Sequence, residues 1–590
     1  MKQNPSPKIG IPRLAGLLAL SALALGGCST VWPGNPVAPQ AAVGAVAAQS
    51  CESLAAGFSY PGTSVTALEK IAAGQVKRPG ITETIPEHCV VTGKMNERIS
   101  PVDGKKYAIG FEMRLPTQWN GRFFYQANGG LDGMRTPAFG EILGGGPRSN
   151  ALTKGFAVIS SDAGHAMDSS TPIGGGTFGL DPQARLDYGY NAVAQLTPMA
   201  KALIKTYYGK RPDKSYIVGT SNGGRHAMVA AARDSGEYDG VLATAPGYNL
   251  PRAAVAQLWD AQQFAKAAQK DSKTGRPNLE TSFTPADLAL VSQKVLERCD
   301  ALDGLRDGIV SDLIACQRSF DLMRDVPTCD KANGSCLTAT QKASLAAVYA
   351  GPKTRDGQPF YIGKAWDPGL AGKDWRTWKF VNAVGPRDAV AAAFVFTTPP
   401  VSPAKLTGAG TSLLDYALGF DLDTDGQKIF ATDSVYTQSA IDFMLPPAAT
   451  SMSKFVARGG KLIVAHGASD PVFSALDTVR WYEGFRAVHG QATEASARFY
   501  LVPGMNHSRN GIATDQFDMV EALVAWVEKG QAPRAIVASA RGAASNLPNP
   551  EVPANWASNR TRLLCPYPAV AKYNGSGSTE DASNFSCTSN

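Results

Sequence analysis

The sequence predicts an α/β fold in which a mainly parallel sheet is interrupted by one large helical insertion. Short apolar runs bounded by turn residues alternate with segments of helical spacing, as is typical of parallel sheets. This alternation stops after Pro246 and resumes at Gly460. The length of 590 residues is also too great for one compact unit.

The first part of the sheet is expected within residues 51–248. The run at residues 155–161 is short, apolar and bounded by turn residues, as expected of a buried strand. The other strands are expected at residues 107–115, 121–126, 214–219 and 240–245. Helices are expected at residues 186–208 and 225–233.

The second part of the sheet is expected within residues 451–590, which also hold a disulfide-stapled C-terminal tail. Its strands are expected at residues 460–465 and 497–502, and its helices at residues 474–488 and 516–529. Between the two parts, residues 249–450 contain helical stretches, four cysteines and aspartate-rich loops. We interpret this segment as an inserted lid domain.

The N-terminus has the features of an export signal. Three basic residues precede an apolar run at residues 14–25, which is followed by Gly26, Gly27 and Cys28. The run is too short to span a bilayer as a stable anchor. Its end is similar to the bacterial lipobox, in which the cysteine is lipidated. An ordinary signal peptide with an unmodified cysteine is the alternative.

We therefore expect residues 1–28 to be a signal peptide and residues 29–50 to be a tether. Ser29 resembles the signal that sorts lipoproteins to the outer membrane. The expected location is that membrane, with a lipid anchor at Cys28, or secretion if the cysteine is unmodified.

The charge pattern does not indicate nucleic acid as a partner. The formal net charge is +7, and Lys2, Lys8 and Arg13 of the leader supply three of these charges. The other basic residues are dispersed, which is typical of a solvated surface and not of a phosphate-binding face. No protein partner is indicated either.

Eight cysteines remain after Cys28, an even number that favours disulfides in an exported chain. Spacing alone leaves about 105 pairings open. No CxxC pair or Cys/His cluster indicates zinc.

A glycine-rich turn contains the candidate nucleophile. Residues 219–223 match the pattern G-x-S-x-G, with Ser221 at the centre, between a predicted strand and a predicted helix. Glycines are needed because the serine lies on a sharp turn that leaves no room for side chains. An ordinary structural turn is the alternative, but the flanking strand and helix favour a nucleophile.

Two backbone N–H groups are expected to bind the oxyanion that forms during attack. One belongs to Asn222, because the helix that starts after the serine directs its N–H groups at that point. The other is expected on the loop after strand 121–126, and Gly129 is the first choice there. A backbone that approaches an oxyanion closely cannot carry a side chain.

The chain has six histidines, and His507 is the best candidate for the base. It follows the predicted strand 497–502, and Asp470 follows the preceding strand 460–465. Each residue alone would be an ordinary polar loop residue. The order Ser, Asp, His at the ends of strands is that of the α/β-hydrolase fold. We therefore predict a serine hydrolase.

The chain resembles the tannase/feruloyl esterase family over nearly all of its length after the leader. The resemblance rests on the serine turn, on residues 161–165, 466–470 and 504–507, and on the large cysteine-containing insertion. It implies hydrolysis of carboxylic esters through an acyl-enzyme, with small aromatic esters as substrates.

The resemblance also implies how the cysteines pair: Cys51 with Cys89, Cys299 with Cys316, Cys329 with Cys336, and Cys565 with Cys587. One departure concerns the site itself. The family usually has a bridged pair of cysteines just before the serine and just after the histidine, where this chain has Thr220 and Ser508. Packing and hydrogen bonds must then hold the triad.

An aspartate-rich loop in the insertion is the candidate metal site. Asp300, Asp303 and Asp307 lie in a glycine-turned loop, and such carboxylates suit a hard cation. The resemblance implies structural calcium, bound by these side chains and by the carbonyls of Leu305 and Ile309. An acidic turn is the alternative. No organic cofactor is expected.

The resemblance implies an acyl group of the feruloyl, galloyl or terephthaloyl-monoester type. It places His466 and Phe473 at the acyl pocket. Arg387 could meet a ring substituent or a carboxylate. Four aromatic lid residues could wall the ring, namely Phe394, Phe396, Trp375 and Trp378. For these lid residues, the core of the lid is the alternative.

Two other functions are weighed against an aromatic esterase. A peptidase or polyester depolymerase could use the same triad, although a large lid narrows access and counts against long polymers. A non-catalytic binding protein is the third hypothesis, and the complete triad disfavours it.

Overall fold

The computed structural model describes residues 39–142, 144, 149–408 and 410–589. The predicted signal peptide and Cys28 lie outside these residues. In the predicted tether, β1 (Ala45–Val46) pairs antiparallel with β5 (Gln118–Trp119), so this part of the tether lies against the fold. Within the described ranges, no helix is long and apolar enough to cross a membrane.

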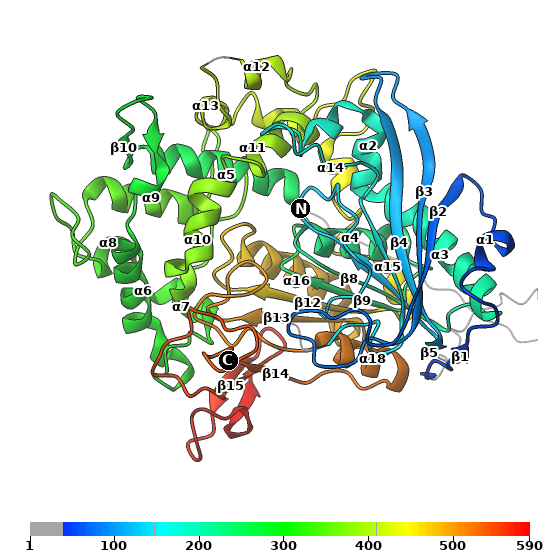
Figure 1. Cartoon of the computed structure of the whole chain (residues 1–590). Helices are drawn as coiled ribbons and strands as arrows, with labels where there is room; N and C mark the ends of the chain where they lie inside the picture. Colours follow the sequence, from blue (N-terminus) through cyan, green and yellow to red (C-terminus); the bar gives the residue numbers. More distant parts are fainter. Residues whose placement is uncertain (1–38, 143, 145–148, 409, 590) are drawn as a thin grey trace, which may run out of the picture. The chain divides into compact units, whose positions relative to one another are not determined.

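The centre of the α/β fold is a nine-stranded sheet with the order β13-β12-β9-β8-β6-β7-β4-β3-β2 (Figure 1). The strands from β13 to β7 are parallel to their neighbours, and β4, β3 and β2 extend the sheet antiparallel. The bounds are β2 Thr63–Ile71, β3 His88–Ile99, β4 Lys106–Pro116, β6 Arg122–Ala127, β7 Ala157–Ser161, β8 Lys214–Thr220, β9 Gly240–Thr244, β12 Lys461–Gly467 and β13 Ala497–Val502.

Helices cover both faces of the parallel part. They are α3 (Ala192–Tyr208), α4 (Asn222–Arg233), α16 (Ala475–His489) and α18 (Met519–Lys529). Because successive residues of a strand point to opposite faces, Ile217 packs in a cluster with residues of α3, α4 and α16, whereas Val218 packs in one with residues of α18. Burial on both faces explains why these strands are continuous apolar runs.

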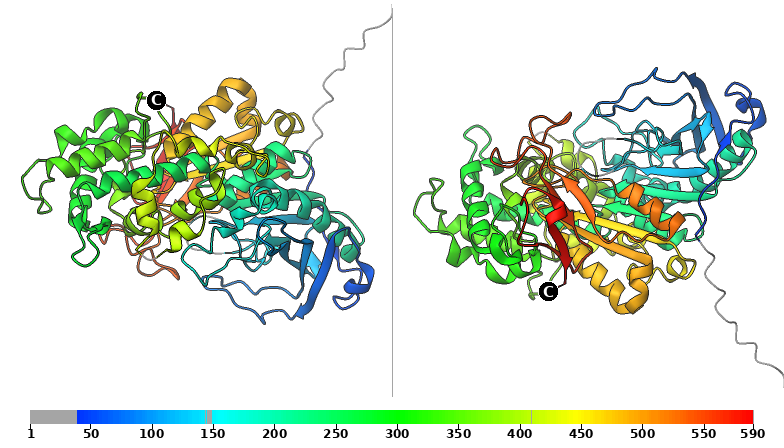
Figure 2. Two further views of the ribbon diagram at one scale, coloured as in Figure 1. Left: turned by 90° about the horizontal axis from the view of Figure 1, so that it is seen from above. Right: turned by 90° about the horizontal axis from the view of Figure 1, so that it is seen from below.

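The insertion lies between β9 and β12 and is mainly helical, as predicted. Figures 1 and 2 show most of its green helices, α6 to α10, gathered on one side of the sheet. The helices are α5 (Leu250–Ala265), α6 (Pro285–Cys299), α7 (Leu313–Ser319), α8 (Leu322–Asp325), α9 (Ala339–Ala350), α10 (Lys373–Thr377), α11 (Asp388–Ala391), α12 (Ala404–Thr407), α13 (Leu413–Gly419) and α14 (Ala440–Met444). Residues of α5 belong to both hydrophobic clusters of the insertion, so this helix joins its two halves.

Four disulfides staple the fold, and they confirm the pairing that the family resemblance implied. They are Cys51–Cys89, Cys299–Cys316, Cys329–Cys336 and Cys565–Cys587. Two lie within the insertion, and Cys565–Cys587 ties the C-terminal tail to itself. Such cross-links stabilise a fold mainly by restricting the unfolded chain.

Candidate active site

Ser221 lies on a sharp turn between β8 and α4, in a strained backbone conformation with φ 61° and ψ −126°. The flanking glycines are required by close packing. A Cβ atom at Gly219 would lie 2.3 Å from the backbone of Gly223, and one at Gly223 would lie 2.2 Å from the carbonyl of Ala127. The sequence pattern is therefore explained by the space available at the turn.

His507 and Asp470 meet Ser221 at the carboxyl ends of three strands of the parallel part of the sheet. His507 lies on the loop after β13, and its Nε2 is 2.9 Å from the Oγ of Ser221. Its Nδ1 is 2.8 Å from Oδ2 of Asp470, which follows β12. The three residues thus form one hydrogen-bonded chain from carboxylate to hydroxyl, in the geometry that lets imidazole accept a hydroxyl proton.

The Asp470 carboxylate is buried and accepts four hydrogen bonds. The backbone N–H groups of Val472 and Phe473 donate to Oδ1, and the rings of His507 and His466 donate to Oδ2. Burial acts to raise the pKa of Asp470, but the charge and hydrogen bonds of the two histidines hold it well below its usual range. Asp470 therefore remains ionised and can stabilise a protonated His507.

The predicted oxyanion donors lie on either side of Ser221. Asn222 is the first residue of α4, and Gly129 follows β6. A Cβ atom at Gly129 would lie 3.6 Å from the Cβ of Ser221, so this backbone does approach the serine closely. Both positions fit backbone donors that face a developing oxyanion.

Asp132 connects these two backbone segments, and sequence reasoning missed it. Its Oδ1 accepts a hydrogen bond of 2.8 Å from the Asn222 side chain, whose own oxygen accepts from Arg225 at 2.6 Å. All three side chains are buried. Asp132 belongs to the turn that begins at Gly129, where its N–H donates to the Gly129 carbonyl. The bond therefore ties the loop of one donor to the helix start of the other.

We expect Asp132→Ala to lower kcat on ester substrates by about tenfold to a hundredfold, with KM little changed. Loss of the bond frees the Asn222 helix start relative to the Gly129 loop. Asp132→Asn keeps an acceptor oxygen and should retain most of the activity. Steady-state kinetics of both variants check this expectation. Equal losses in the two variants would contradict a role in aligning the donors.

Two adjoining cavities open at Ser221. The larger is a cleft of about 700 Å³, and the smaller is a cavity of about 40 Å³. Gly130, Ser221, Trp378 and Arg387 line both. The Trp378 and Phe473 rings lie beside His507, with centroid distances of 5.2 and 5.5 Å. Two aromatic side chains thus border the reacting atoms.

The structure brings only part of the predicted acyl pocket together. Phe473 lines the small cavity, and Arg387 lines both cavities. His466 instead lies behind the acid, fully buried between Asp470 and Thr478. Of the aromatic lid residues, Phe396 and Trp378 line the small cavity, whereas Phe394 and Trp375 are buried in the core of the insertion.

The difference between the two phenylalanines has a local cause. Residues Ala392–Phe396 form a π-helical turn, which has more residues per turn than an α-helix. Ordinary helical periodicity therefore does not identify the residue that faces the site. The small cavity is also lined by residues that the sequence did not single out, namely Gly130, Leu131, Tyr188, Leu250, Asp388, Ala391 and Val472.

Thr220 and Ser508 face each other next to the triad. The Thr220 hydroxyl donates a hydrogen bond of 2.7 Å to the Oγ of Ser508. Ser508 has a left-handed backbone with φ 73°. This bond joins the strand end before Ser221 to the residue after His507, as expected of a substitute for a covalent bridge.

A family model and a known protein of similar sequence both match this chain over most of its length. A family model described as "Tannase and feruloyl esterase" matches residues 89–588. Mono(2-hydroxyethyl) terephthalate hydrolase of Piscinibacter sakaiensis is 40% identical over 533 residues, which cover 85% of each chain.

Two solved structures share the fold. Feruloyl esterase B from Aspergillus oryzae has a TM-score of 0.69 at 21% identity, covering 91% of this chain and 99% of that one. Tannin acyl hydrolase from Aspergillus niger has a TM-score of 0.63 at 18% identity, covering 92% of this chain and 95% of that one.

Proposed function

The chain belongs to the tannase and feruloyl esterase family, and on that premise we propose that it is an exported serine hydrolase that cleaves esters of aromatic acids. The observation that carries the proposal is the hydrogen-bonded chain of Asp470, His507 and Ser221, of which His507 and Ser221 line the cleft. The family model and the relatives support hydrolysis of carboxylic esters.

The proposed reaction proceeds through an acyl-enzyme. His507 Nε2 takes the proton of the Ser221 hydroxyl while Oγ attacks the ester carbonyl carbon. The carbonyl oxygen becomes an oxyanion that accepts hydrogen bonds from the backbone N–H groups of Gly129 and Asn222. The intermediate collapses, His507 gives its proton to the departing alcohol oxygen, and the acyl group stays on Ser221.

A water molecule then hydrolyses the acyl-enzyme, and His507 again acts first as a base and then as an acid. His507 takes a proton from a water molecule, whose oxygen attacks the acyl carbon. When the second tetrahedral intermediate collapses, the Ser221 oxygen leaves and recovers its proton from His507. The carboxylic acid departs. Asp470 keeps its charge throughout and stabilises the imidazolium that forms twice.

The cavities suit an aromatic acyl group. Trp378, Phe396 and Phe473 offer apolar surface next to Ser221, and aromatic rings pack well against such faces. Arg387 lines both cavities, so it can meet a polar ring substituent. We propose feruloyl, galloyl and terephthaloyl monoesters as the substrate class. The names of two relatives, a mono(2-hydroxyethyl) terephthalate hydrolase and a probable feruloyl esterase, support the terephthaloyl and feruloyl types.

A substrate screen tests this function. We expect the purified chain to hydrolyse at least one of methyl ferulate, methyl gallate and mono(2-hydroxyethyl) terephthalate, with kcat/KM in the range of working enzymes, about 10⁴ M⁻¹s⁻¹ or more. Casein peptides and polyester film serve as substrates for the competing hypotheses. Hydrolysis of peptide or film without hydrolysis of the small esters would contradict the proposal.

Export and lipid anchoring at Cys28 are part of the proposal. Four disulfides support an oxidising compartment, because such bonds persist mainly outside the cytosol. We expect bacteria that express the full chain to incorporate radiolabelled palmitate into it, and Cys28→Ser to abolish the label. A signal peptide without lipidation would give a secreted chain with no label.

Structural calcium is proposed at the aspartate-rich loop of the insertion. Asp300 accepts hydrogen bonds from the backbone N–H groups of Asp307 and Gly308, and Asp303 accepts them from Leu305 and Ser311. Neither carboxylate forms an ion pair with a cationic side chain within the described residues. Asp303 is buried. Uncompensated carboxylates of this kind suit a hard cation.

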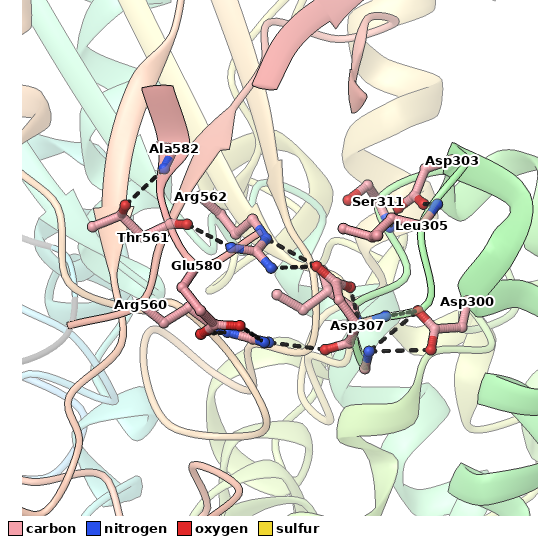
Figure 3. Close-up of polar contacts among 12 residues, drawn as sticks. Asp300, Asp303, Leu305, Asp307, Ser311, Arg560, Thr561, Arg562, Glu580 and Ala582 are labelled. Carbon is pink, nitrogen blue, oxygen red and sulfur yellow. Dashed lines mark hydrogen bonds and ion pairs between the residues drawn. The ribbon is translucent and has the colours of Figure 1, made fainter. Parts of the chain in front are cut away.

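The third carboxylate, Asp307, already has a cationic partner. Figure 3 shows it between the Asp300 carboxylate and the Arg562 guanidinium, which donates through Nε at 3.0 Å. Arg560 donates to the Asp307 carbonyl at 2.8 Å (Figure 3). No three acidic, histidine or cysteine side chains in the described part of the chain converge as a ready metal site. The site would therefore be held by Asp300, Asp303 and the carbonyls of Leu305 and Ile309.

Chelation tests the calcium proposal. We expect EDTA to lower the melting temperature by several degrees, because an ion that binds only the folded state stabilises it by mass action. Asp303→Asn should remove that response. Asp421→Asn, in an acidic loop that pairs with Arg355, is the matched control and should keep it. An EDTA-independent melting temperature with no copurifying metal would rule calcium out.

A further inference from the structure

A buried carboxylate of the insertion contacts both loops that carry the acid and the base. Asp367 is fully buried. Its Oδ1 accepts a hydrogen bond from the Ser469 hydroxyl, and its Oδ2 accepts one of 3.2 Å from the Gly504 backbone N–H. Ser469 directly precedes Asp470, and Gly504 lies three residues before His507. Asp367 therefore joins the acid loop to the base loop.

A second residue, Asn506, adds bonds among the same three segments. Its side-chain amide donates to the carbonyl of Gly369 in the insertion at 2.9 Å and to the carbonyl of Ser469 at 3.4 Å. The packing is close, because a Cβ atom at Gly369 would lie 2.3 Å from the Gly504 carbonyl oxygen and 2.8 Å from the Ser469 Cβ. The turn at residues 367–369, the acid loop and the base loop are thus in direct contact.

The surroundings of Asp367 are unusual for a buried carboxylate. Charged side chains are rarely fully buried unless they are paired, and Asp367 forms no ion pair in the described part of the chain. Its donors are Ser469, Gly504 and the Gly369 backbone N–H, which is 3.0 Å from Oδ1. Burial raises the pKa of Asp367, and these three donors oppose the rise. Two of the three donors lie on the loops of the triad.

A role as a helix cap explains only one of these bonds. Asp367 caps the short helix Pro368–Ala371 through the Gly369 N–H. Serine or asparagine caps such a helix start about as well, and the capping bond uses Oδ1 alone. The bonds to Ser469 and Gly504 occupy both carboxylate oxygens. The two loops therefore account for the carboxylate better than the cap does.

Building on the proposed function, we propose that Asp367 is a positioning residue for the triad, so that the insertion completes the active site as well as covering it. Asp367 fixes the acid loop relative to the base loop, and this keeps the Asp470 carboxylate at Nδ1 of His507. Asp367 lines neither cavity at Ser221, so it does not touch the substrate. Its loss should therefore lower kcat and leave KM nearly unchanged.

The test measures kcat and KM on 4-nitrophenyl acetate and on an aromatic ester. We expect Asp367→Ala to lower kcat on the order of a hundredfold, because misplacing a catalytic group by about 1 Å has an effect of that size, and to change KM by less than about threefold. Asp367→Asn keeps one acceptor oxygen and should lose about tenfold. Ser469→Ala removes only the bond to the acid loop and should also lose about tenfold, so the test stands even if Asp367→Ala does not fold.

A double-mutant cycle with His507→Ala separates positioning from a general role in folding. Without the imidazole, the placement of the two loops no longer affects the reaction. We expect Asp367→Ala to lower the residual kcat of His507→Ala by less than about twofold. Asp287→Asn is the matched control, since Asp287 is a buried carboxylate that bonds Thr284 and Gln341 within the insertion. It should lower the melting temperature and leave kcat within about twofold.

Two results would overturn the inference. A folded Asp367→Ala enzyme with wild-type kcat would show that the loops need no such contact. Equal losses in the wild-type and His507→Ala backgrounds would show that Asp367 acts on the fold as a whole and not through the base. If the wild type hydrolyses neither ester and a fluorophosphonate does not label Ser221, the proposed function itself fails, so the two failures can be told apart.

Discussion

Replacing Ser221 by alanine is expected to lower kcat on every ester substrate by about four to six orders of magnitude. The hydroxyl oxygen forms the bond to the acyl group, and no other described hydroxyl is bonded to His507 Nε2. His507→Ala should cost about as much, because the serine loses its base. The double variant should be no worse than either single one, since residues that act as a unit are not additive.

Folding of these variants must be shown to be intact. Ser221 and His507 are at the cleft surface, so we expect melting temperatures close to wild type. Asp470→Asn should also be severe, because the amide leaves His507 in the wrong tautomer. His466→Ala is a useful comparison: it removes one hydrogen bond to Asp470 and leaves the triad in place. Near-normal turnover by Ser221→Ala or His507→Ala would refute the assignment.

The pair Thr220→Cys with Ser508→Cys is expected to form a disulfide and to stabilise the fold by up to about 5 kcal/mol. The two Oγ atoms lie 2.7 Å apart, and cysteine sulfurs at these places need a separation of about 2.0 Å. The closed loop is long, because the residues are 288 positions apart. Strain in the native state would reduce the gain.

Thiol titration of the unfolded double variant and its melting curve check this expectation. No free thiol beyond those of the wild type should be found before reduction, and reductant should lower the melting temperature more than it does for the wild type. Each single variant should gain nothing from oxidation. Two additional free thiols without reductant would show that these positions cannot be bridged.

The parallel sheet and the triad could be predicted because their signals are local. Strands buried on both faces are continuous apolar runs, and β8 leads directly into a glycine turn and a helix. Asp470 and His507 each follow such a strand, so the known order of residues in this fold identified both. The order of the three residues along the chain was therefore sufficient to predict that they meet.

The antiparallel extension was not predicted in full. β2 and β3 have largely exposed or mixed residues, and β2 forms the edge of the sheet. A weakly amphipathic edge strand gives little periodic signal.

The walls of the pocket could not be predicted because they depend on how the insertion packs. Asp388 is far from Ser221 in sequence, and only tertiary contacts bring the two to one cavity. His466 lies four residues before Asp470, and the sequence could not show whether its side chain faces the substrate or the acid. Asp132 carried no motif, and its role follows from its bond to Asn222.

The most direct test of the central claim is covalent labelling with a fluorophosphonate probe, followed by mass spectrometry of the peptides. The account predicts one labelled residue, Ser221, with no label in Ser221→Ala and a strongly slowed reaction in His507→Ala. Prior incubation with an intact aromatic ester substrate should slow labelling while its acyl group occupies the serine. Ester hydrolysis by a protein that carries no label on Ser221, or carries it on another residue, would contradict the account.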